Sequence, residues 1–104
     1  MAYWLMICRH KPGLDALREK TRDAHRAHVV SGGGARVLIG SALMEDDAST
    51  AQGNFGVLEA DSREAAMRFA ETDPYALAGL VAGIEIIALP ARFPADRIDP
   101  MSAQ

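Results

Sequence analysis

The sequence predicts one α+β domain whose elements follow the order β-α-β-β-α-β. Four segments have the length and composition of strands, and two amphipathic segments with helical spacing lie between them. Glycine or proline stands at most of the boundaries. The chain has 104 residues, of which 49% are hydrophobic, so it is long enough for a single domain with its own core.

The first strand is expected at residues 3–8, an apolar run that Pro12 and Gly13 soon follow. Because apolar and polar residues do not alternate in this run, we expect both faces of the strand to be buried. Its Cys8 is the single cysteine, which excludes a disulfide within the chain and favours a buried, inert thiol. We see no signal peptide and no apolar run near the ~20 residues of a membrane span. The expectation is a reduced cytoplasmic protein without a membrane partner.

The charge balance bears on the class of partner. The chain carries 11 basic and 14 acidic residues, which gives a formal charge of −3. Its basic residues are scattered, whereas nucleic-acid binders usually concentrate them in a patch. We therefore expect no nucleic-acid partner.

A helical pattern follows at residues 14–30, and the glycines at 32–34 end it. These glycines do not indicate a phosphate loop, because that motif needs a strand before it and a helix after it. Steps of three and four predict that one face of the helix holds Leu14, Leu17, Thr21, Ala24 and His28.

The second and third strands are expected at residues 35–43 and 53–60. The polar, acidic segment 44–52 between them is long for a hairpin connection, so we interpret it as a mobile loop, either a lid or plain disorder. Alternation should divide the second strand into two sides, with Val37, Ile39 and Ser41 opposite Leu38, Gly40 and Ala42.

The second helix should begin at a capping box made by Asp61 and Glu64. It should end near Asp73, because a residue before proline avoids the helical conformation. Asp73 can then cap a short helical piece, with Pro74 at its first position and Gly79 as its stop. The apolar face of the second helix is predicted to consist of Ala65, Ala66, Phe69 and Ala70.

A fourth strand is expected at residues 81–89, and Pro90 ends it. The domain then covers residues 1–90, and residues 91–104 form a tail without periodicity. This tail is either an arm that lies on a partner subunit or a frayed end.

This order of elements is that of the ferredoxin-like fold, with a four-stranded antiparallel sheet and both helices on one face. The other face of the sheet would be bare. The first strand has no polar side and the fourth shows only Glu85, so this bare face should form a large apolar patch. We therefore expect a homodimer joined through the sheet faces.

Candidate functional groups gather where the two helices should pack side by side. Arg22, His25 and His28 follow one another at three-residue steps and project to adjacent surface. A carboxylate from Asp73 could hold one nitrogen of His25 and orient the ring as a general base. We predict His25 and Asp73 as the catalytic pair. Arg22, which could anchor an anion, Tyr75 and His28 are predicted to bind the substrate, and Glu85 could also line the pocket.

Simpler interpretations of these residues stay open. His28 could be a packed histidine, and Asp73 could be only a helix cap. His25 and His28 could in principle share a metal ion, but an i, i+3 spacing suits this less than i, i+4, and no carboxylate or thiol neighbour is obvious in the sequence. We therefore predict no metal and no cofactor.

Taken together, these residues resemble the YciI-like, or YCII-related, family over residues 1–90. R-x-x-H is common by itself, and its combination with the other elements at matching distances is what makes the likeness specific. The resemblance is carried by Arg22-Asp23-Ala24-His25, by Gly40 at the end of the second strand, by Glu64-Ala65-Ala66, and by Asp73-Pro74-Tyr75 with Ala78-Gly79.

The resemblance implies a dimeric α+β barrel and a pocket whose family histidine and aspartate fall on His25 and Asp73. Most of the family has no assigned function; some members act as dehydrochlorinases on chlorinated aromatics, and fold relatives include muconolactone isomerases and small monooxygenases. This sequence departs from the family pattern at Ser41, where proline is usual, and at Arg26, where an apolar residue is usual. Both departures bear on the entrance of the pocket and on the substrate.

Two functions follow as hypotheses, with a plainer third. The chain could be a cofactor-independent lyase or isomerase that moves a proton with His25 and Asp73 on a small anionic or cyclic molecule. It could instead be a non-catalytic small-molecule binding or accessory module with the same pocket. In the third interpretation both residues are structural, and dimerisation is the only role.

Overall fold

The computed structural model describes residues 2–102 and confirms the predicted α+β fold. The elements follow the expected order, with a short third helix after the second and a 3₁₀ turn in the tail. Their bounds are β1 Ala2–His10, α1 Asp15–Ser31, β2 Arg36–Met44, β3 Ala51–Ala60, α2 Arg63–Glu71, α3 Pro74–Leu77, β4 Val81–Leu89 and the 3₁₀ turn Ala95–Arg97.

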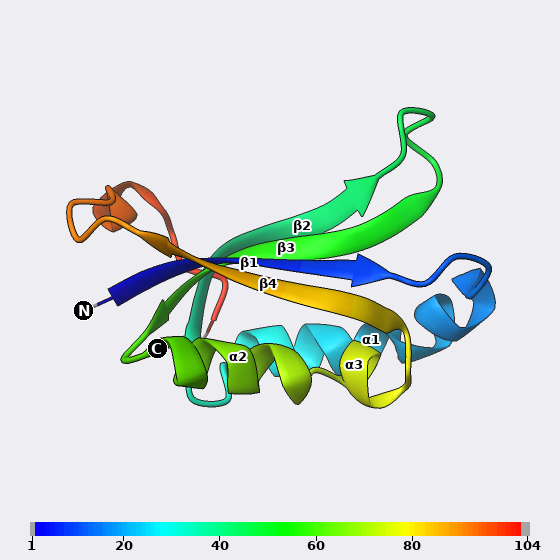
Figure 1. Ribbon diagram of the computed structural model, residues 1–104, viewed down its shortest axis with the longest axis horizontal. Helices are drawn as coiled ribbons and strands as arrows, with labels where there is room; N and C mark the ends of the chain where they lie inside the picture. The colour runs from blue at the N-terminus through cyan, green and yellow to red at the C-terminus, as the bar shows by residue number, and fades with distance from the viewer. Residues whose placement is uncertain (1, 103–104) are drawn as a thin grey trace.

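The strands form one antiparallel sheet in the order β2-β3-β1-β4, the arrangement of the ferredoxin-like fold. All three α-helices lie on one side of this sheet (Figure 1). The β2–β3 hairpin bends away from the helix layer toward its turn, whereas α2 stays close beneath the other end of the sheet (Figure 1).

The hydrophobic core fills the space between the sheet and α2. The side chains of Leu58 and Phe69 are completely buried in it, and the Trp4 indole N–H donates to the carbonyl of Ala60 at its edge. The predicted inner face of α2 is confirmed, because its buried residues are Ala65, Ala66, Phe69 and Ala70.

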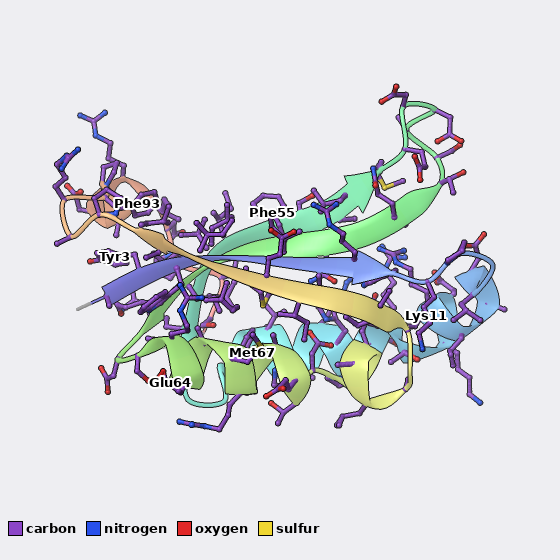
Figure 2. The ribbon with its side chains drawn as sticks, viewed as in Figure 1. Tyr3, Lys11, Phe55, Glu64, Met67 and Phe93 are labelled. Atoms are coloured by element: carbon purple, nitrogen blue, oxygen red, sulfur yellow. The ribbon has the colours of Figure 1, made fainter. Side chains whose placement is uncertain are left out.

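The opposite face of the sheet carries apolar side chains as well. Ile39 and Ile87 on this face are 45% and 43% exposed, and the Tyr3 ring packs on Phe93 with centroids 5.6 Å apart. Phe55 projects from the same face, away from the helices (Figure 2). The apolar outer face is therefore present, and the homodimer that we expect through it stays a prediction.

The β2 strand does not alternate as predicted. Its register against β3 shifts between Val37 and Ile39, so that Leu38 has no partner in the ladder. Val37 and Leu38 are both buried as a result, although strict alternation would place them on opposite faces. This bulge rotates the rest of β2 and decides which of its residues face the helices.

The loop between the second and third strands is shorter than predicted, because only residues 45–50 of the segment 44–52 lie outside the strands. β2 extends to Met44 and β3 begins at Ala51, and these two residues are paired. The turn between them is closed by Asp47, whose carboxylate accepts hydrogen bonds from the backbone N–H groups of Ser49 and Thr50 and from the Thr50 hydroxyl. The prediction of a loop is thus confirmed over residues 45–50, and its bounds were too wide because small, acidic residues are typical of both loops and tight turns.

The start of α2 also differs from the prediction. Ser62, not Asp61, is the N-cap, and its hydroxyl accepts a hydrogen bond from the backbone N–H of Ala65. Glu64 therefore stands at the second helical position, and the capping box is absent. Serine and aspartate are about equally good N-caps, so the sequence alone does not decide whether Asp61 or Ser62 caps the helix.

The predicted inward face of α1 is confirmed except at Ala24, which is exposed. The other four predicted residues are half-buried, and three more residues join this face: Arg18, His25 and Val29. None of the residues of α1 is fully buried. The helix ends as expected, because Gly32 has a φ of 67° and its N–H donates to the carbonyl of His28.

The described end of the tail packs against β2 and the end of α1 of the same chain. The backbone N–H groups of Met101 and Ser102 donate to the carbonyl of Val37. The buried Ser102 hydroxyl accepts from the Val37 N–H and donates to the carbonyl of Val29. The described end of the tail is thus held against its own chain, and residues 103–104 lie outside the described part.

No helix within residues 2–102 combines the length and the apolar character needed to cross a membrane.

Candidate active site

A cleft of about 440 Å³ lies between α1 and the inner face of the sheet. It exists because the sheet presents very small residues there: Gly40 pairs with Gly56, and Ala42 stands next in line on β2. The helix opposite them buries none of its residues fully, so the two walls do not close. Polar groups in its lining include Arg18, Arg22, His25, Asn54, Asp73 and Tyr75.

His25 and Asp73 meet in this cleft, as the sequence suggested. The His25 Nδ1 lies 2.7 Å from the Asp73 Oδ2, although 48 residues separate them in the chain. The side chains are 16% and 6% exposed. The carboxylate accepts the Nδ1–H, which leaves the Nε2 of His25 without a partner in the described residues.

The carboxylate of Asp73 has two partners, one for each oxygen. Its Oδ1 accepts the backbone N–H of Tyr75 at 2.8 Å, which makes Asp73 the cap of α3. Pro74 stands at the first helical position and Gly79 has a φ of 86°, as the local rules predicted. Capping fixes the carboxylate and so aims Oδ2 at His25.

The ring of Tyr75 holds the imidazole from one face. The two rings are stacked, with centroids 4.1 Å apart and an angle of 13° between their planes. Burial raises the pKa of Tyr75 above its usual value of 10, and Arg18 opposes this shift. The phenol therefore stays protonated at neutral pH and can donate a hydrogen bond.

Three arginines stand along the wall of the cleft that α1 provides. Arg18, Arg22 and Arg26 follow one another at four-residue steps and all line the cleft. Arg22 forms a long ion pair with Glu19 at 3.6 Å, and the guanidinium of Arg18 lies 5.8 Å from the Tyr75 ring centroid. The three guanidinium groups outnumber the single carboxylate of Asp73 in the lining, so this row leaves the cleft positively charged.

The other predicted site residues lie elsewhere. The His28 Nε2 is 2.9 Å from the carbonyl oxygen of Phe69, and its ring stacks on the Phe69 ring. His28 therefore packs against α2 and does not line the cleft. Glu85 points to the outer face of the sheet, where it pairs with Arg9 at 3.2 Å, so the suggestion that it lines the pocket is wrong.

Neither the thiol nor a metal cluster adds chemistry in the described residues. Burial, with a contribution from the Asp73 carboxylate, raises the pKa of the Cys8 thiol to about 12. Cys8 is thus a poor nucleophile at neutral pH. Within residues 2–102, no group of three His, Cys, Asp or Glu side chains is arranged to hold a metal ion.

Two polar residues that were not among the predicted site residues meet at the sheet, and one of them, Asn54, lines the cleft. The His10 Nε2 lies 2.8 Å from the Asn54 Oδ1, and the His10 ring meets the edge of the Tyr75 ring with centroids 5.2 Å apart. Asn54 is buried and lines the cleft. The available signal was its position on an inward-facing register with Gly56 and Leu58, where an amide is out of place.

Comparisons with solved structures agree with the fold. The 5-chloro-2-hydroxyhydroquinone dehydrochlorinase TftG from Burkholderia phenoliruptrix, in complex with 2,5-dihydroxybenzoquinone, matches with a TM-score of 0.73 at 24% identity. The match covers 85% of this chain and 93% of that one.

Two other structures match less closely. The protein At3g17210 from Arabidopsis thaliana has a TM-score of 0.41 at 9% identity, with 86% of this chain and 94% of that chain covered. An MhuD variant with two manganese protoporphyrin IX bound per active site has a TM-score of 0.43 at 20% identity, with 88% and 94% covered.

The sequence comparisons identify the family. No curated protein matches the sequence significantly. A family model described as the YCII-related domain matches residues 1–90, which is most of the chain and includes every element from β1 to β4. The chain therefore belongs to the YCII-related domain family.

Proposed function

We propose that this protein is a cofactor-independent lyase or isomerase that moves a proton on a small anionic or cyclic organic molecule. The observation that carries the proposal is the 2.7 Å contact between the His25 Nδ1 and the Asp73 Oδ2 inside an open cleft. A base of this kind must be oriented by a second group and must reach a substrate, and the contact with Asp73 and the position of His25 in the cleft support both conditions.

The proposed chemistry starts at the Nε2 of His25. Asp73 accepts the Nδ1–H, so the lone pair of the neutral imidazole lies on Nε2 and can take a proton from carbon or oxygen. The C–H bond breaks, an N–H bond forms, and the electron pair passes into the substrate. Return of the proton at another carbon completes an isomerisation. Departure of a leaving group such as chloride, with its bonding electrons, completes an elimination.

The charge of the cleft supports an anionic substrate. Arg18, Arg22 and Arg26 all line it, and Arg22 has only a long contact to an exposed Glu19. Arginine suits carboxylate or phenolate oxygens because its guanidinium can donate two parallel hydrogen bonds. The volume of about 440 Å³ lies within the usual range of small-molecule pockets and suits one ring.

The structural neighbour supports a conjugated ring as the substrate class. TftG is named for the dehydrochlorination of a chlorinated hydroquinone, and its complex contains 2,5-dihydroxybenzoquinone. Loss of hydrogen chloride from such a ring is an elimination that one base can promote. We extend this class of reaction to the present chain as part of the proposal.

The first prediction tests the pair directly. His25→Gln and Asp73→Asn should each lower kcat by about 100- to 10,000-fold on a substrate found by screening halogenated and hydroxylated aromatic acids and quinols. His28→Gln is the matched control, because His28 lies on the same helix but outside the cleft, and it should leave kcat within about twofold. Full activity in both His25→Gln and Asp73→Asn would remove the pair from the mechanism.

The alternative is a binding or accessory module with the same cleft. Its support is that Asp73 caps α3 and Tyr75 stacks on His25, so each residue also has a structural task. Ligands that raise the melting temperature and are recovered unaltered after long incubation favour this module. Chemical conversion that depends on His25 favours the enzyme.

A further inference from the structure

His10 and Asn54 form a second polar pair on the sheet side of the cleft. His10 ends β1 and Asn54 lies on β3, and the His10 Nε2 is 2.8 Å from the Asn54 Oδ1. Asn54 is only 6% exposed, yet it belongs to the lining of the cleft that holds His25 and Tyr75. The proposed proton transfer between His25 and the substrate does not involve this pair.

The surroundings of His10 decide which way the hydrogen bond runs. Its Nδ1 is buried and has no hydrogen-bond partner among residues 2–102. A buried N–H without an acceptor costs more than a lone pair without a donor, so the proton belongs on Nε2. The Nε2–H therefore donates, and the Asn54 Oδ1 accepts.

The neutral state of His10 agrees with this assignment. Burial is the main cause that lowers the pKa of His10 from 6.5. The hydrogen bond to Asn54 acts in the opposite direction, and the charge of Arg18 lowers the pKa further. At neutral pH the imidazole is thus uncharged and carries one proton. Its tautomer fixes the orientation of the Asn54 amide.

With Oδ1 occupied by His10, Asn54 is left with its NH₂ group. No acceptor for this nitrogen is recorded in the part of the chain that the structure describes. His25 stands on α1 and Asn54 on the sheet, so a ligand in the cleft would lie between a base and a pair of N–H donors. A fixed donor opposite a base is the arrangement that stabilises an oxygen on which negative charge develops.

We propose that the side-chain amide of Asn54, held by His10, is the donor that recognises a carbonyl or enolate oxygen of the substrate. This inference rests on the proposed function and narrows its substrate class to molecules with such an oxygen conjugated to the reacting carbon. When the Nε2 of His25 takes a proton from that carbon, the C–H electron pair delocalises to the oxygen. Asn54 touches the substrate, and His10 is a positioning residue.

The tautomer of His10 tests the orientation without any ligand. Nitrogen-15 NMR of the wild-type protein at neutral pH should show the His10 ring with its proton on Nε2 and a bare Nδ1. A proton on Nδ1 would turn the Asn54 oxygen toward the cleft and would overturn the inference. His10→Phe should retain folded spectra and shift the side-chain amide signals of Asn54.

Binding of a probe tests the recognition. Titration with 2,5-dihydroxybenzoquinone should shift the Asn54 amide signals, and Asn54→Ala should weaken binding by about tenfold, the usual effect of losing one good hydrogen bond. Asn54→Asp, which replaces the donor with a carboxylate of the same shape, should weaken binding further. Gln52→Ala is the matched control, because Gln52 is exposed on the same strand and its side-chain amide donates to the carbonyl of Met44.

The outcomes separate this inference from the proposed function. Unchanged binding in Asn54→Ala, together with weakened binding in Arg22→Ala, would exclude Asn54 while the cleft remains the site. A wild-type protein that does not bind the probe up to the limit of its solubility would overturn the proposed substrate class and this inference with it. Folding of each variant is checked by its amide spectrum, and Asn54→Asp stands in where Asn54→Ala fails to fold.

Discussion

Asp73 combines two roles that are usually weighed as alternatives. One oxygen caps α3 through Tyr75 and the other orients His25, at 2.8 and 2.7 Å. Asparagine at this position can keep the cap with its oxygen, but it presents an N–H to His25 and reverses the hydrogen bond. Asp73→Asn therefore changes the tautomer of His25 more than the stability of the fold, which makes it the more informative variant.

His10 makes the stability of the protein depend on pH. Because burial lowers its pKa below the 6.5 of the unfolded chain, the unfolded state binds more protons in mild acid. The contribution of His10 is present above about pH 6.5 and is lost as the pH falls through the lower, folded pKa. Urea unfolding at a series of pH values between about 7.5 and 5 should show a steeper loss of stability in the wild type than in His10→Gln. Equal slopes in the two proteins would contradict this assignment.

Local sequence rules predicted the roles of Asp73 and Tyr75 in the site, but they could not predict the contact between His10 and Asn54. The Asp-Pro-Tyr corner is specified by neighbours in the sequence, through proline geometry and capping. The contact between His10 and Asn54 joins positions 44 apart, and it depends on the register between β1 and β3. The whole sheet sets the register, so no short segment of the sequence predicts this contact.

Among the elements, α2 was predicted closely and β2 was not. The inner face of α2 follows from period alone, and its four buried residues are those expected. β2 contains a bulge after Val37, and a single extra residue reverses the side on which all later residues lie. Gly40 faces the cleft because the bulge places it opposite Gly56.

The start of α2 provides a test at the element scale. Ser62→Ala removes the hydroxyl that accepts the Ala65 N–H, and it should lower the free energy of unfolding by about 1 kcal/mol. Asp61→Ala, one residue earlier and exposed, is the matched control and should change it by less than about 0.5 kcal/mol. Chemical denaturation measures both. The reverse order of effects would restore Asp61 as the cap.

At the scale of the whole molecule, the outer face of the sheet predicts association. Ile39 and Ile87 on this face are exposed, Phe55 projects from it, and the helices shield only the other face (Figures 1 and 2). Burial of such a patch against a second copy would remove apolar surface from water at about 25 cal/mol per Å². The expected state is a dimer with two clefts, one on the helix side of each subunit.

Substitution on this face tests the dimer. Ile87→Asp should convert a wild-type dimer to monomer at micromolar concentration, because a pair of facing carboxylates cannot be buried without partners. Light scattering coupled to gel filtration measures the mass. Leu77→Asp is the control, because Leu77 is also exposed but belongs to α3 on the opposite side of the sheet. A monomeric wild type at that concentration would contradict the expectation.

The loose seating of α1 has a consequence for how such a protein can change its substrate. The helix supplies the three arginines and His25 of the cleft wall, yet none of its residues is fully buried. Exchanges of its cleft-facing arginines therefore create no core cavity, and they should change the free energy of unfolding only little. The stabilising core lies mainly between the sheet and α2. Selection, in nature or in a laboratory library, can thus change the substrate specificity through residues of one helix while the fold stays the same.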